Sequence, residues 1–434
     1  MAAFRLARSS FIGLTKGRLL VDISPLRGSQ DFRRLWTAQL LSWCGRQVVV
    51  VAMPYQVYVL THSSLAVGAL GLIQILPIVM AGLYGGGFAD RFDRRLVQAA
   101  GKSVGACGSL CLAVGAAAGT PPLGLVFGVA AVTAAAWAID QSARAATLPR
   151  LIAPRMLPSA LGLTQITYQT AAVGGPVLGG VVIAAAGLRW AYLIDVMAFV
   201  PASVLLLTLA SLPPTLEGHV TFGWKAPAEG LRYVRNNRLI LGLFAADLIA
   251  MTFGMPTAVF PALALTVLGY GPALLGLLYA GPAIGALVGS VLSGWVGSID
   301  HQARAVVWAI AIWGLAIAAF GQSGSILWLA LPLLAIAGVA DLISAILRST
   351  ILQLTVPDSM RGRMSALHSM VTTTGPRLGD LEAGGVAALV SPTFSVISGG
   401  LACVVGIGLL AATLPELRHQ RSPAHHSGEP DADA

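Results

Sequence analysis

The stretch GGGFADRFDRRL, residues 85–96, is a short polar segment between two long apolar ones, residues 65–88 and 96–118. Each apolar segment reaches the roughly 20 residues that a helix needs to cross a bilayer. Charged side chains and irregular backbone are excluded from lipid, so the polar segment must lie in water between two membrane-spanning helices. The pattern therefore predicts an all-α membrane protein.

Three features of the polar segment are typical of a turn at a membrane surface. The glycines at 85–87 remove side chains where the two helices would approach each other as they leave the bilayer. Asp90 is placed to begin the second helix, because free backbone N–H groups stabilise a carboxylate there. Arg91, Arg94 and Arg95 favour the cytoplasmic side. We expect a tight cytoplasmic turn.

The composition of the whole chain supports this fold class. Of its 434 residues, 56% are hydrophobic and only 10% are charged, whereas soluble proteins carry about 25% charged residues. A formal charge of +9 would suggest a nucleic-acid partner in a soluble protein. Here the basic residues fall where cytoplasmic loops and anionic lipid headgroups favour them. We expect the lipid bilayer as a partner and no nucleic acid.

No catalytic or metal-binding pattern is found in the sequence. Residues 101–105, GKSVG, imitate the end of a phosphate-binding loop and a hydrolase nucleophile motif, but they open an apolar helix and follow no strand. Lys102 is therefore interpreted as a charge at the inner membrane face. We expect no enzyme, no cofactor and no metal site. The cysteines are interpreted as packing residues; they are Cys44, Cys107, Cys111 and Cys403.

Apolar segments long enough to cross a bilayer recur along the chain, and we predict twelve of them. They are residues 35–60, 65–88, 96–118, 123–147, 159–186, 189–212, 239–267, 272–297, 305–322, 326–355, 363–390 and 393–414. The segments between them alternate in charge, and those on one face contain a single basic residue, Arg189. The positive-inside tendency then places both termini in the cytoplasm.

The spans suggest five parts of the chain. Residues 1–34 are a basic cytoplasmic segment without the apolar core of a signal peptide. Two six-helix bundles follow at 35–212 and 239–414, separated by a cytoplasmic loop at 213–238 that contains a basic amphipathic helix. The polar tail, 415–434, is expected to be disordered.

The two halves carry similar glycine and proline patterns, which predicts a duplicated bundle. Residues 174–180 read GGPVLGG in the fifth span, and residues 375–380 read GPRLGD in the eleventh. The two patterns lie at equivalent places in each half, as internal repeats of transporters do.

These features together resemble the major facilitator superfamily, over about residues 31–420. Its signature after the second span is matched by Gly86, Asp90, Arg91, Arg94 and Arg95. Asp93 stands where the signature has glycine. The resemblance implies alternating access between two bundles, with Asp90, Arg91 and Arg144 forming a latch that closes the cytoplasmic side.

The fifth span further resembles the motif of drug-proton antiporters, which implies export. The matching residues are Gly162, Gly175, Pro176, Gly179 and Gly180, with Ala171 where glycine is usual. Residues 51–64 (VAMPYQVYVLTHSS) and 414–421 (LPELRHQR) resemble siderophore exporters of this superfamily. The resemblance implies a small-molecule cargo in the cell membrane and antiport with protons; a broad multidrug or macrolide exporter is the alternative.

Charges inside the spans can be weighed independently, because each costs at least ~2.5–3.5 kcal/mol at the centre of a bilayer. Asp140 and Arg144 are four residues apart on one predicted helix, and Arg377 and Asp380 are three apart on another. At these spacings the two opposite charges of each pair can neutralise each other. Asp195, six residues past Arg189, is interpreted as a structural residue near the outer interface.

The remaining embedded charges are our candidates for coupling and for cargo. Asp247 has no obvious local partner, and a buried carboxylate without a partner favours its protonated form. Asp247, Asp341 and Asp380 are therefore the predicted proton carriers. Arg46 and Arg377 are the predicted cargo contacts, because a cation facing a central cavity favours anionic or catecholate-like compounds.

We expect a monomer that exports its cargo as two bundles rock about a central site. A non-transporting sensor or a membrane-embedded enzyme on the same scaffold is the alternative of another class. A sensor would bind ligand without flux across vesicles, and an enzyme would need a nucleophile or metal cluster at the membrane face.

The latch can be tested at Asp90. Asp90→Asn should cripple transport and leave the amount of protein in the membrane unchanged, because only the charge that holds the cytoplasmic side closed is lost. Cargo efflux and membrane-inserted protein are measured in the same cells. Undiminished efflux would refute the role of Asp90.

Overall fold

The computed structural model describes residues 22–211, 225–324 and 326–419, and within them the side chains of all but 83–90, 225–227, 297–298, 358–359 and 418–419. The described residues form helices and no strand. The helices before the central loop are α2 (Ser24–Gly28), α3 (Gln30–Thr61), α4 (Ser64–Arg91), α5 (Arg94–Ala117), α6 (Leu123–Leu151), η1 (Pro154–Met156), α7 (Leu157–Ala186) and α8 (Leu188–Leu207). Those after it are α9 (Lys225–Asn236), α10 (Arg238–Phe253), η2 (Thr257–Val259), α11 (Phe260–Ala262), η3 (Leu263–Val267), α12 (Gly271–Leu292), η4 (Ser293–Ser298), α13 (Gln302–Gln322), α14 (Leu327–Thr355), α15 (Asp358–Leu389), α16 (Pro392–Thr413) and α17 (Glu416–His419).

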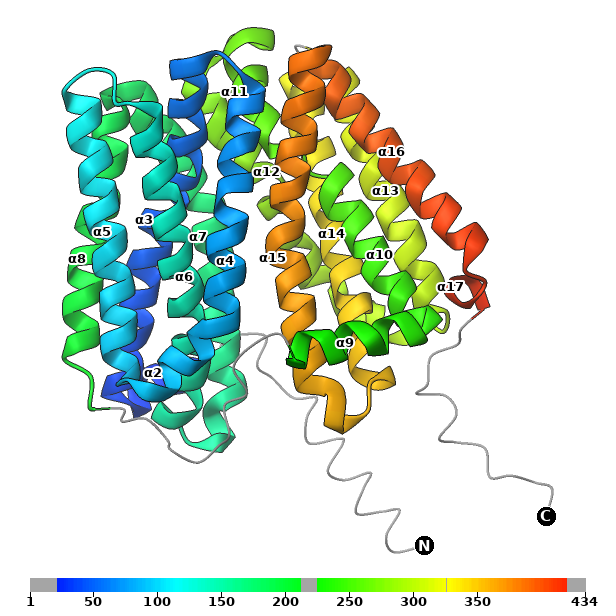
Figure 1. The fold of residues 1–434 in the computed structure, drawn as a ribbon, viewed down its shortest axis with the longest axis horizontal. Helices are drawn as coiled ribbons and strands as arrows, with labels where there is room; N and C mark the ends of the chain where they lie inside the picture. Colours follow the sequence, from blue (N-terminus) through cyan, green and yellow to red (C-terminus); the bar gives the residue numbers. More distant parts are fainter. Residues whose placement is uncertain (1–21, 212–224, 325, 420–434) are drawn as a thin grey trace, which may run out of the picture.

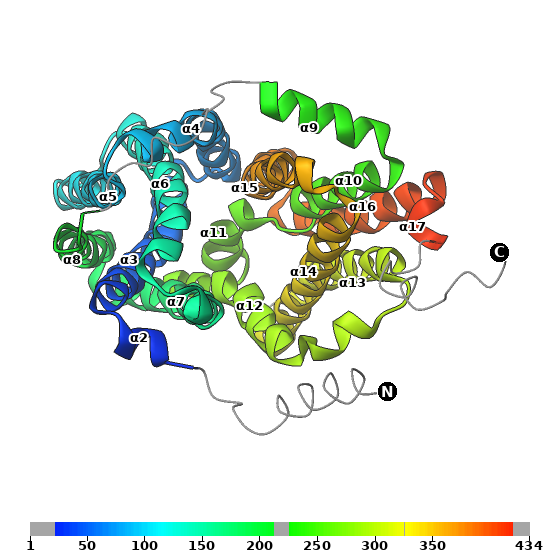
Figure 2. The ribbon, with the colours of Figure 1, turned by 90° about the horizontal axis from the view of Figure 1, so that it is seen from below.

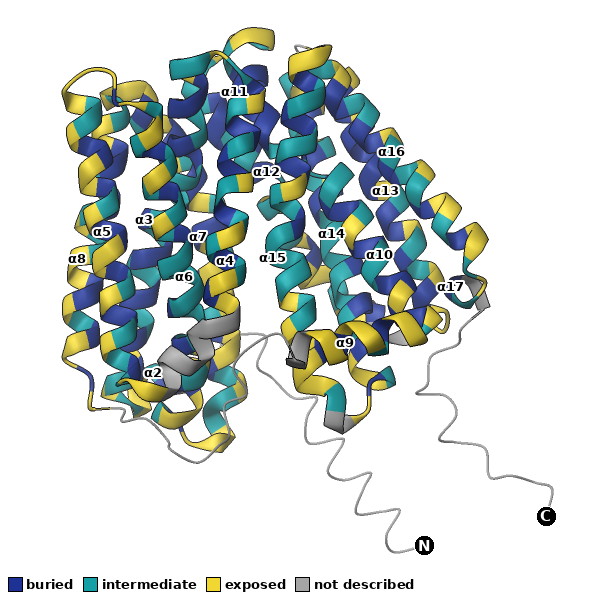
Figure 3. Cartoon of the chain, viewed as in Figure 1, coloured by how far each residue is buried: buried dark blue, intermediate teal, exposed yellow. Residues whose placement is uncertain are grey.

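Ten helical segments among the described residues are long and apolar enough to cross a membrane. Helices α3 and α15 are not among the ten, although each is 32 residues long, and both contain several charged side chains. Large apolar side chains such as Leu76, Val291 and Trp328 are exposed. Exposed residues recur along the outward sides of the helices (Figure 3). Such a surface is unfavourable in water and suits lipid.

The long helices form two groups, α3 to α8 and α10 to α16, which stand side by side (Figure 1). Within the first group α8 packs on α3 and α5, and α6 packs on α4 and α5. Within the second, α13 packs on α14 and α16, and α10 packs on α15. The groups meet mainly where α7 packs on α12 and where α4 packs on α15.

Glycines permit these two contacts between the groups. A Cβ atom on Gly180 of α7 would lie 2.6 Å from the carbonyl oxygen of Pro272 in α12, and one on Gly276 would collide with the carbonyl oxygen of Pro176. On the other side, a Cβ on Gly68 of α4 would collide with the carbonyl oxygen of Asp380 in α15. The helix backbones therefore touch directly, as small residues allow in membranes.

The turn between α4 and α5 is shorter than we predicted. Helix α4 continues to Arg91, so only Phe92 and Asp93 separate the two helices. The expectation that Asp90 begins α5 is wrong: Asp93 is the N-cap, and its carboxylate accepts a hydrogen bond from the backbone N–H of Arg95 at 3.1 Å. An N-cap carboxylate satisfies an otherwise unpaired donor, which explains an acid where the signature has glycine. The side chains of residues 85–90 lie outside the described part.

The predicted span 239–267 is not one continuous helix. Helix α10 ends at Phe253, and the chain continues through the short helices η2, α11 and η3. Pro256 and Pro261 explain the interruption, because proline lacks an N–H and disfavours helix before it. The carbonyl oxygen of Gly254, freed by the break, accepts a hydrogen bond from Nε1 of Trp313 at 2.8 Å.

The amphipathic helix predicted in the central loop is present as α9, which lies across the lower ends of the second group (Figure 1). Its Val234 is buried against Ile240, Leu352 and Met364. The rest of the loop, 212–224, lies outside the described residues. Helices α2 and α17 lie toward the same end of the molecule as α9, which we call the α9 end (Figure 1).

The contact between α7 and α12 can be tested by Gly180→Ala. The added methyl would force the two helices apart, so the melting temperature in detergent should fall by several degrees, and transport at least tenfold. The matched control is Gly174→Ala on the same helix, where a Cβ meets nothing within 4 Å. Equal effects of the two substitutions would contradict the packing role of Gly180.

Candidate functional site

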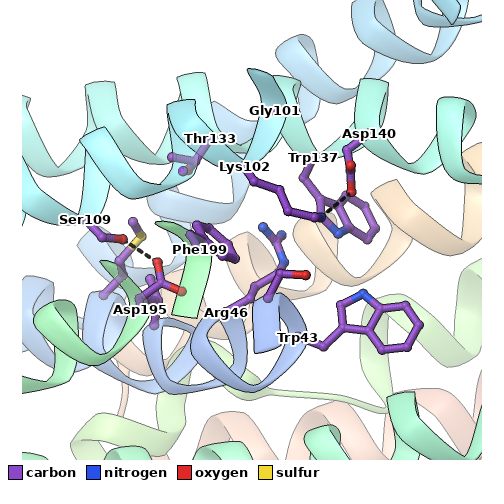
Figure 4. A pocket seen from close by; sticks show the side chains of 14 residues that line it. Trp43, Arg46, Gly101, Lys102, Ser109, Thr133, Trp137, Asp140, Asp195 and Phe199 are labelled. Carbon is purple, nitrogen blue, oxygen red and sulfur yellow. Dashed lines mark hydrogen bonds and ion pairs between the residues drawn. The ribbon is translucent and has the colours of Figure 1, made fainter. Parts of the chain in front are cut away.

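A polar cavity of about 50 Å³ lies inside the first group of helices, between α3, α5, α6 and α8 (Figure 4). Four charged side chains line it, one from each helix: Arg46, Lys102, Asp140 and Asp195. Trp137 of α6 forms part of the same wall. A cluster of two cations and two carboxylates inside membrane-spanning helices marks a functional site by default.

Lys102 and Asp140 form a buried ion pair, with Nζ 3.1 Å from Oδ2. The side chains are 7% and 9% exposed, so the interpretation of Lys102 as a charge at the membrane face is wrong. The lysine points inward because Gly101 lets α5 approach α6 closely: a Cβ there would lie 3.3 Å from the carbonyl oxygen of Ala136. The motif GKSVG thus serves packing. Asp140 therefore pairs with Lys102 of α5, and not with Arg144 of its own helix as the sequence spacing predicts.

Asp195 is the functional candidate that the sequence analysis missed. It is 2% exposed and accepts a hydrogen bond from Ser109 of α5, whereas we expected it near the outer interface. Its Oδ1 atom has no hydrogen-bond partner among the described residues. Gly45 of α3 leaves room for it, since a Cβ there would lie 2.6 Å from Oδ1. An isolated acid in an apolar span was the available signal.

Two arginines stack on tryptophans in this region. The guanidinium of Arg46 lies 4.7 Å from the ring centre of Trp137, and that of Arg144 lies 4.8 Å from the ring centre of Trp43. Arg144 also donates a hydrogen bond to Gln141, and Trp43 packs edge-on against Tyr168. A cation over an aromatic face gains about 0.5–2 kcal/mol, more where water is excluded.

A larger cleft, of about 480 Å³, lies between the two groups of helices. It is bounded by α4 and α6 on one side and by α15 on the other; its lining includes Gly82, Trp137, Gln141, Ser142, Arg363, Ser369, Met370 and Thr373. Trp137 therefore lines both the cleft and the polar cavity. A cleft of this volume is in the range of small-molecule sites.

The second group of helices holds its own buried charges. Asp247 of α10 lies 3.0 Å from Nη2 of Arg348 on α14 and 3.8 Å from Nδ1 of His368 on α15. The interpretation of Asp247 as a carboxylate without a partner is therefore wrong: its partners come from helices that follow a hundred residues later. Asp341 lines a small apolar pocket, and its Oδ1 has no hydrogen-bond partner within the described part of the chain.

The expected pairing of Arg377 with Asp380 is confirmed, at 3.9 Å between Nη1 and Oδ2. Asp380 also accepts hydrogen bonds from the Thr257 hydroxyl and from the backbone N–H of Ala258 at 3.0 Å. Asp380 thereby holds the broken segment after α10 against α15.

The structure describes the side-chain contacts of only some residues of the predicted cytoplasmic gate. Arg94 donates to the carbonyl oxygen of Ala146 at 2.9 Å, and Arg95 to that of Leu209 at 2.7 Å, so both tie α5 to neighbouring segments. Gly86 lies within α4, and the Asp90 side chain lies outside the described part, so the latch of Asp90, Arg91 and Arg144 stays a prediction.

The glycines of the antiporter motif differ in their surroundings. A Cβ on Gly175 would collide with Gln47 of α3, and one on Gly179 would lie 3.1 Å from the carbonyl oxygen of Val48. Together with Gly180 and Pro176 they let α7 pack tightly between α3 and α12. Gly162 meets nothing within 4 Å and is not required for packing here.

The buried pair of Lys102 and Asp140 predicts a stability effect. Lys102→Met should destabilise the protein by about 3 kcal/mol, because it leaves Asp140 buried without a countercharge. Lys102→Met combined with Asp140→Leu should recover most of the loss, and Arg155→Met at an exposed position serves as the control. Thermal unfolding in detergent measures all three. A double variant no more stable than the single one would contradict the pairing.

Comparison with known proteins places the chain among transporters. It is 28% identical to the enterobactin exporter EntS of Citrobacter koseri, over 93% of this chain and 96% of that protein. It is 27% identical to the enterobactin exporter EntS of Escherichia coli K12, over 94% and 97%.

Solved transporter structures share the fold. A bacterial homologue of the iron transporter ferroportin superposes with a TM-score of 0.67 at 16% identity, covering 90% of this chain and 99% of that one. A transporter of the POT family superposes with a TM-score of 0.72 at 11% identity, covering 90% and 97%. Residues 21–434 match the family described as transmembrane secretion effector. The chain therefore belongs to this family of major facilitator transporters and is a multi-pass membrane transporter, not an enzyme.

Proposed function

We propose that this transporter exports a small anionic or catechol-bearing molecule, such as a siderophore, by alternating access. The observation that carries the proposal is the pair of arginines stacked on tryptophans, Arg46 on Trp137 and Arg144 on Trp43, of which Trp137 also lines the cleft between the helix groups. Relatives named enterobactin exporters support the same class of cargo.

The chemistry of this wall suits such a cargo. A guanidinium offers several hydrogen-bond donors in one plane, which match the paired oxygens of carboxylates and catecholates. Trp137 offers an aromatic face at the cleft on which a planar ring can stack. Arg46 has no ion pair within the described residues, and its guanidinium lies over Trp137, which lines both the polar cavity and the cleft. Arg377, on the opposing group, is the second cargo candidate.

The arrangement also supports alternating access. The close glycine contacts lie near the start of α4 and α12 and the end of α7 and α15, away from the α9 end. The cleft is lined by Gly82, Ser142 and Arg363, which belong to the other halves of α4, α6 and α15. The protein thus has one closed end and one open end.

We infer the following topology. Twelve crossings form two six-helix bundles, residues 35–212 and 239–414, and the protein acts as a monomer with both termini in the cytoplasm. The α9 end then faces the cytoplasm, and the open cleft takes up cargo there. Residues 89–95 should accordingly be labelled only from the cytoplasmic side.

Proton antiport is the proposed source of energy. Among the sequence candidates, Asp341 has the best support, because it has neither an ion pair nor a hydrogen bond among the described residues. Asp247 and Asp380 have cationic or donor partners on neighbouring segments.

A broad multidrug exporter is the second candidate. The cleft lining contains Ile78, Val79, Leu367 and Met370, and an apolar wall with a flexible methionine adapts to varied lipophilic compounds. Vesicles that transport macrolides but no catecholate would favour this function.

The cargo proposal is tested at Arg46 in inverted membrane vesicles. Arg46→Gln should lower the initial rate of enterobactin uptake about tenfold, because an attraction of roughly 1.4 kcal/mol between the guanidinium and an anionic cargo is removed. Arg46→Lys should retain part of the rate, since the charge remains but the planar donor array is lost. A neutral macrolide should be transported equally by all three proteins.

Unchanged enterobactin uptake in Arg46→Gln would exclude Arg46 as a cargo contact. No uptake by the wild-type protein, with macrolide transport intact, would replace the siderophore proposal by the multidrug one.

A further inference from the structure

Helix α9 exposes one face and buries the other. Ala228, Leu231, Arg232 and Arg235 recur at helical spacing and are all exposed, while Val234 is buried. Seen from the α9 end, the helix lies along the outer rim of the molecule, beside α15 and α10, rather than over the cleft (Figure 2). Its exposed face is therefore in a position to meet lipid.

The exposed face combines apolar, cationic and acidic side chains, and its carboxylate, Glu229, pairs with Arg363 of α15. Leu231 is 52% exposed and stands next to Arg232. Within residues 22–211, 225–324 and 326–419, no carboxylate forms an ion pair with Arg232 or Arg235. A leucine beside two arginines suits the headgroup region of a bilayer, where the apolar side chain enters the acyl boundary and guanidinium groups meet phosphates. In water the leucine side chain would have no apolar surroundings of this kind.

An ion pair and an apolar contact connect α9 to a wall of the cleft; the side chains of the pair, Glu229 and Arg363, are 49% and 43% exposed. Glu229 Oε2 lies 2.9 Å from Nη1 of Arg363 on α15, and Val234 packs against Met364 in the next position. Arg363 itself lines the cleft, as does Ser369 two turns further along the same helix. A force on α9 is therefore transmitted to the part of α15 that must move when the cleft closes.

We propose that the exposed face of α9 binds the headgroups of anionic phospholipids, and that the bound lipid acts through Glu229 and Arg363 to set how far the cleft opens. The inference uses the proposed orientation only to assign the lipid to the cytoplasmic leaflet. It needs no assumption about cargo or coupling ion.

Lipid binding is measured on the full chain by native mass spectrometry with phosphatidylglycerol. Each arginine at an anionic surface contributes about a fivefold gain in binding. Arg232→Gln combined with Arg235→Gln should therefore weaken binding about twenty-five-fold. Arg304→Gln, an exposed arginine at the start of α13, is the charge-matched control and should bind as the wild type does. Equal binding by the double variant and the control would overturn the site.

The effect on the cleft is measured as the distance between spin labels at Ser142→Cys and Ser369→Cys, with the four native cysteines replaced. The protein is placed in phosphatidylcholine nanodiscs with or without about one third phosphatidylglycerol. The distance distribution should shift with the anionic lipid in the wild type and stay unshifted in the arginine double variant. Glu229→Gln should bind the lipid and lose the shift, because only the link to α15 is broken.

An unchanged distance distribution in the wild type with and without phosphatidylglycerol would overturn the proposal that the lipid sets how far the cleft opens. A shift that persists in Glu229→Gln would overturn the route through Arg363. Neither measurement contains cargo, so a failure of the export proposal leaves both results interpretable.

Discussion

An ionised side chain in the middle of a bilayer needs a partner, and this requirement ties together helices that are distant in sequence. Lys102 and Asp140 join α5 to α6, and Arg348 and Asp247 join α14 to α10. Breaking such a pair leaves a buried charge, which is far more costly than never having had the pair. The pairs therefore fix which helix faces meet, and the cavity and the cleft are built on that arrangement.

Contacts between the two helix groups follow a different rule. They rest on backbone meeting backbone at Gly180 and Gly276, and at Gly68 opposite Asp380. In lipid no hydrophobic force drives helices together, so such contacts depend on close packing. Surfaces without interlocking side chains can pivot on each other at small cost. The same glycines that hold one end closed thus suit a rocking motion that opens and closes the other.

The sequence predicted what depends on local composition. The apolar spans, the amphipathic helix α9 and the pairing of Arg377 with Asp380 all arise within one helix or one segment. It did not predict partners supplied by other helices, such as Arg348 for Asp247. Spacing along one helix also suggested Arg144 for Asp140, because neighbours four residues apart are visible in a sequence and neighbours across a helix interface are not. The N-cap role of Asp93 was missed because the turn is only two residues long.

Trp137 makes the polar cavity and the cleft depend on each other. Lys102 and Asp140 neutralise each other, so Arg46 faces the field of Asp195 on one side and the ring of Trp137 on the other. Under the proposed function, the positive charge of Arg46 attracts both an anionic cargo on the cleft face of Trp137 and the carboxylate of Asp195. A neutral cargo of the same shape gains only the aromatic contact. In a low-dielectric wall the charge term is the larger of the two. The first group of helices is thus suited to select cargo by charge, and the apolar lining of the cleft to select it by size.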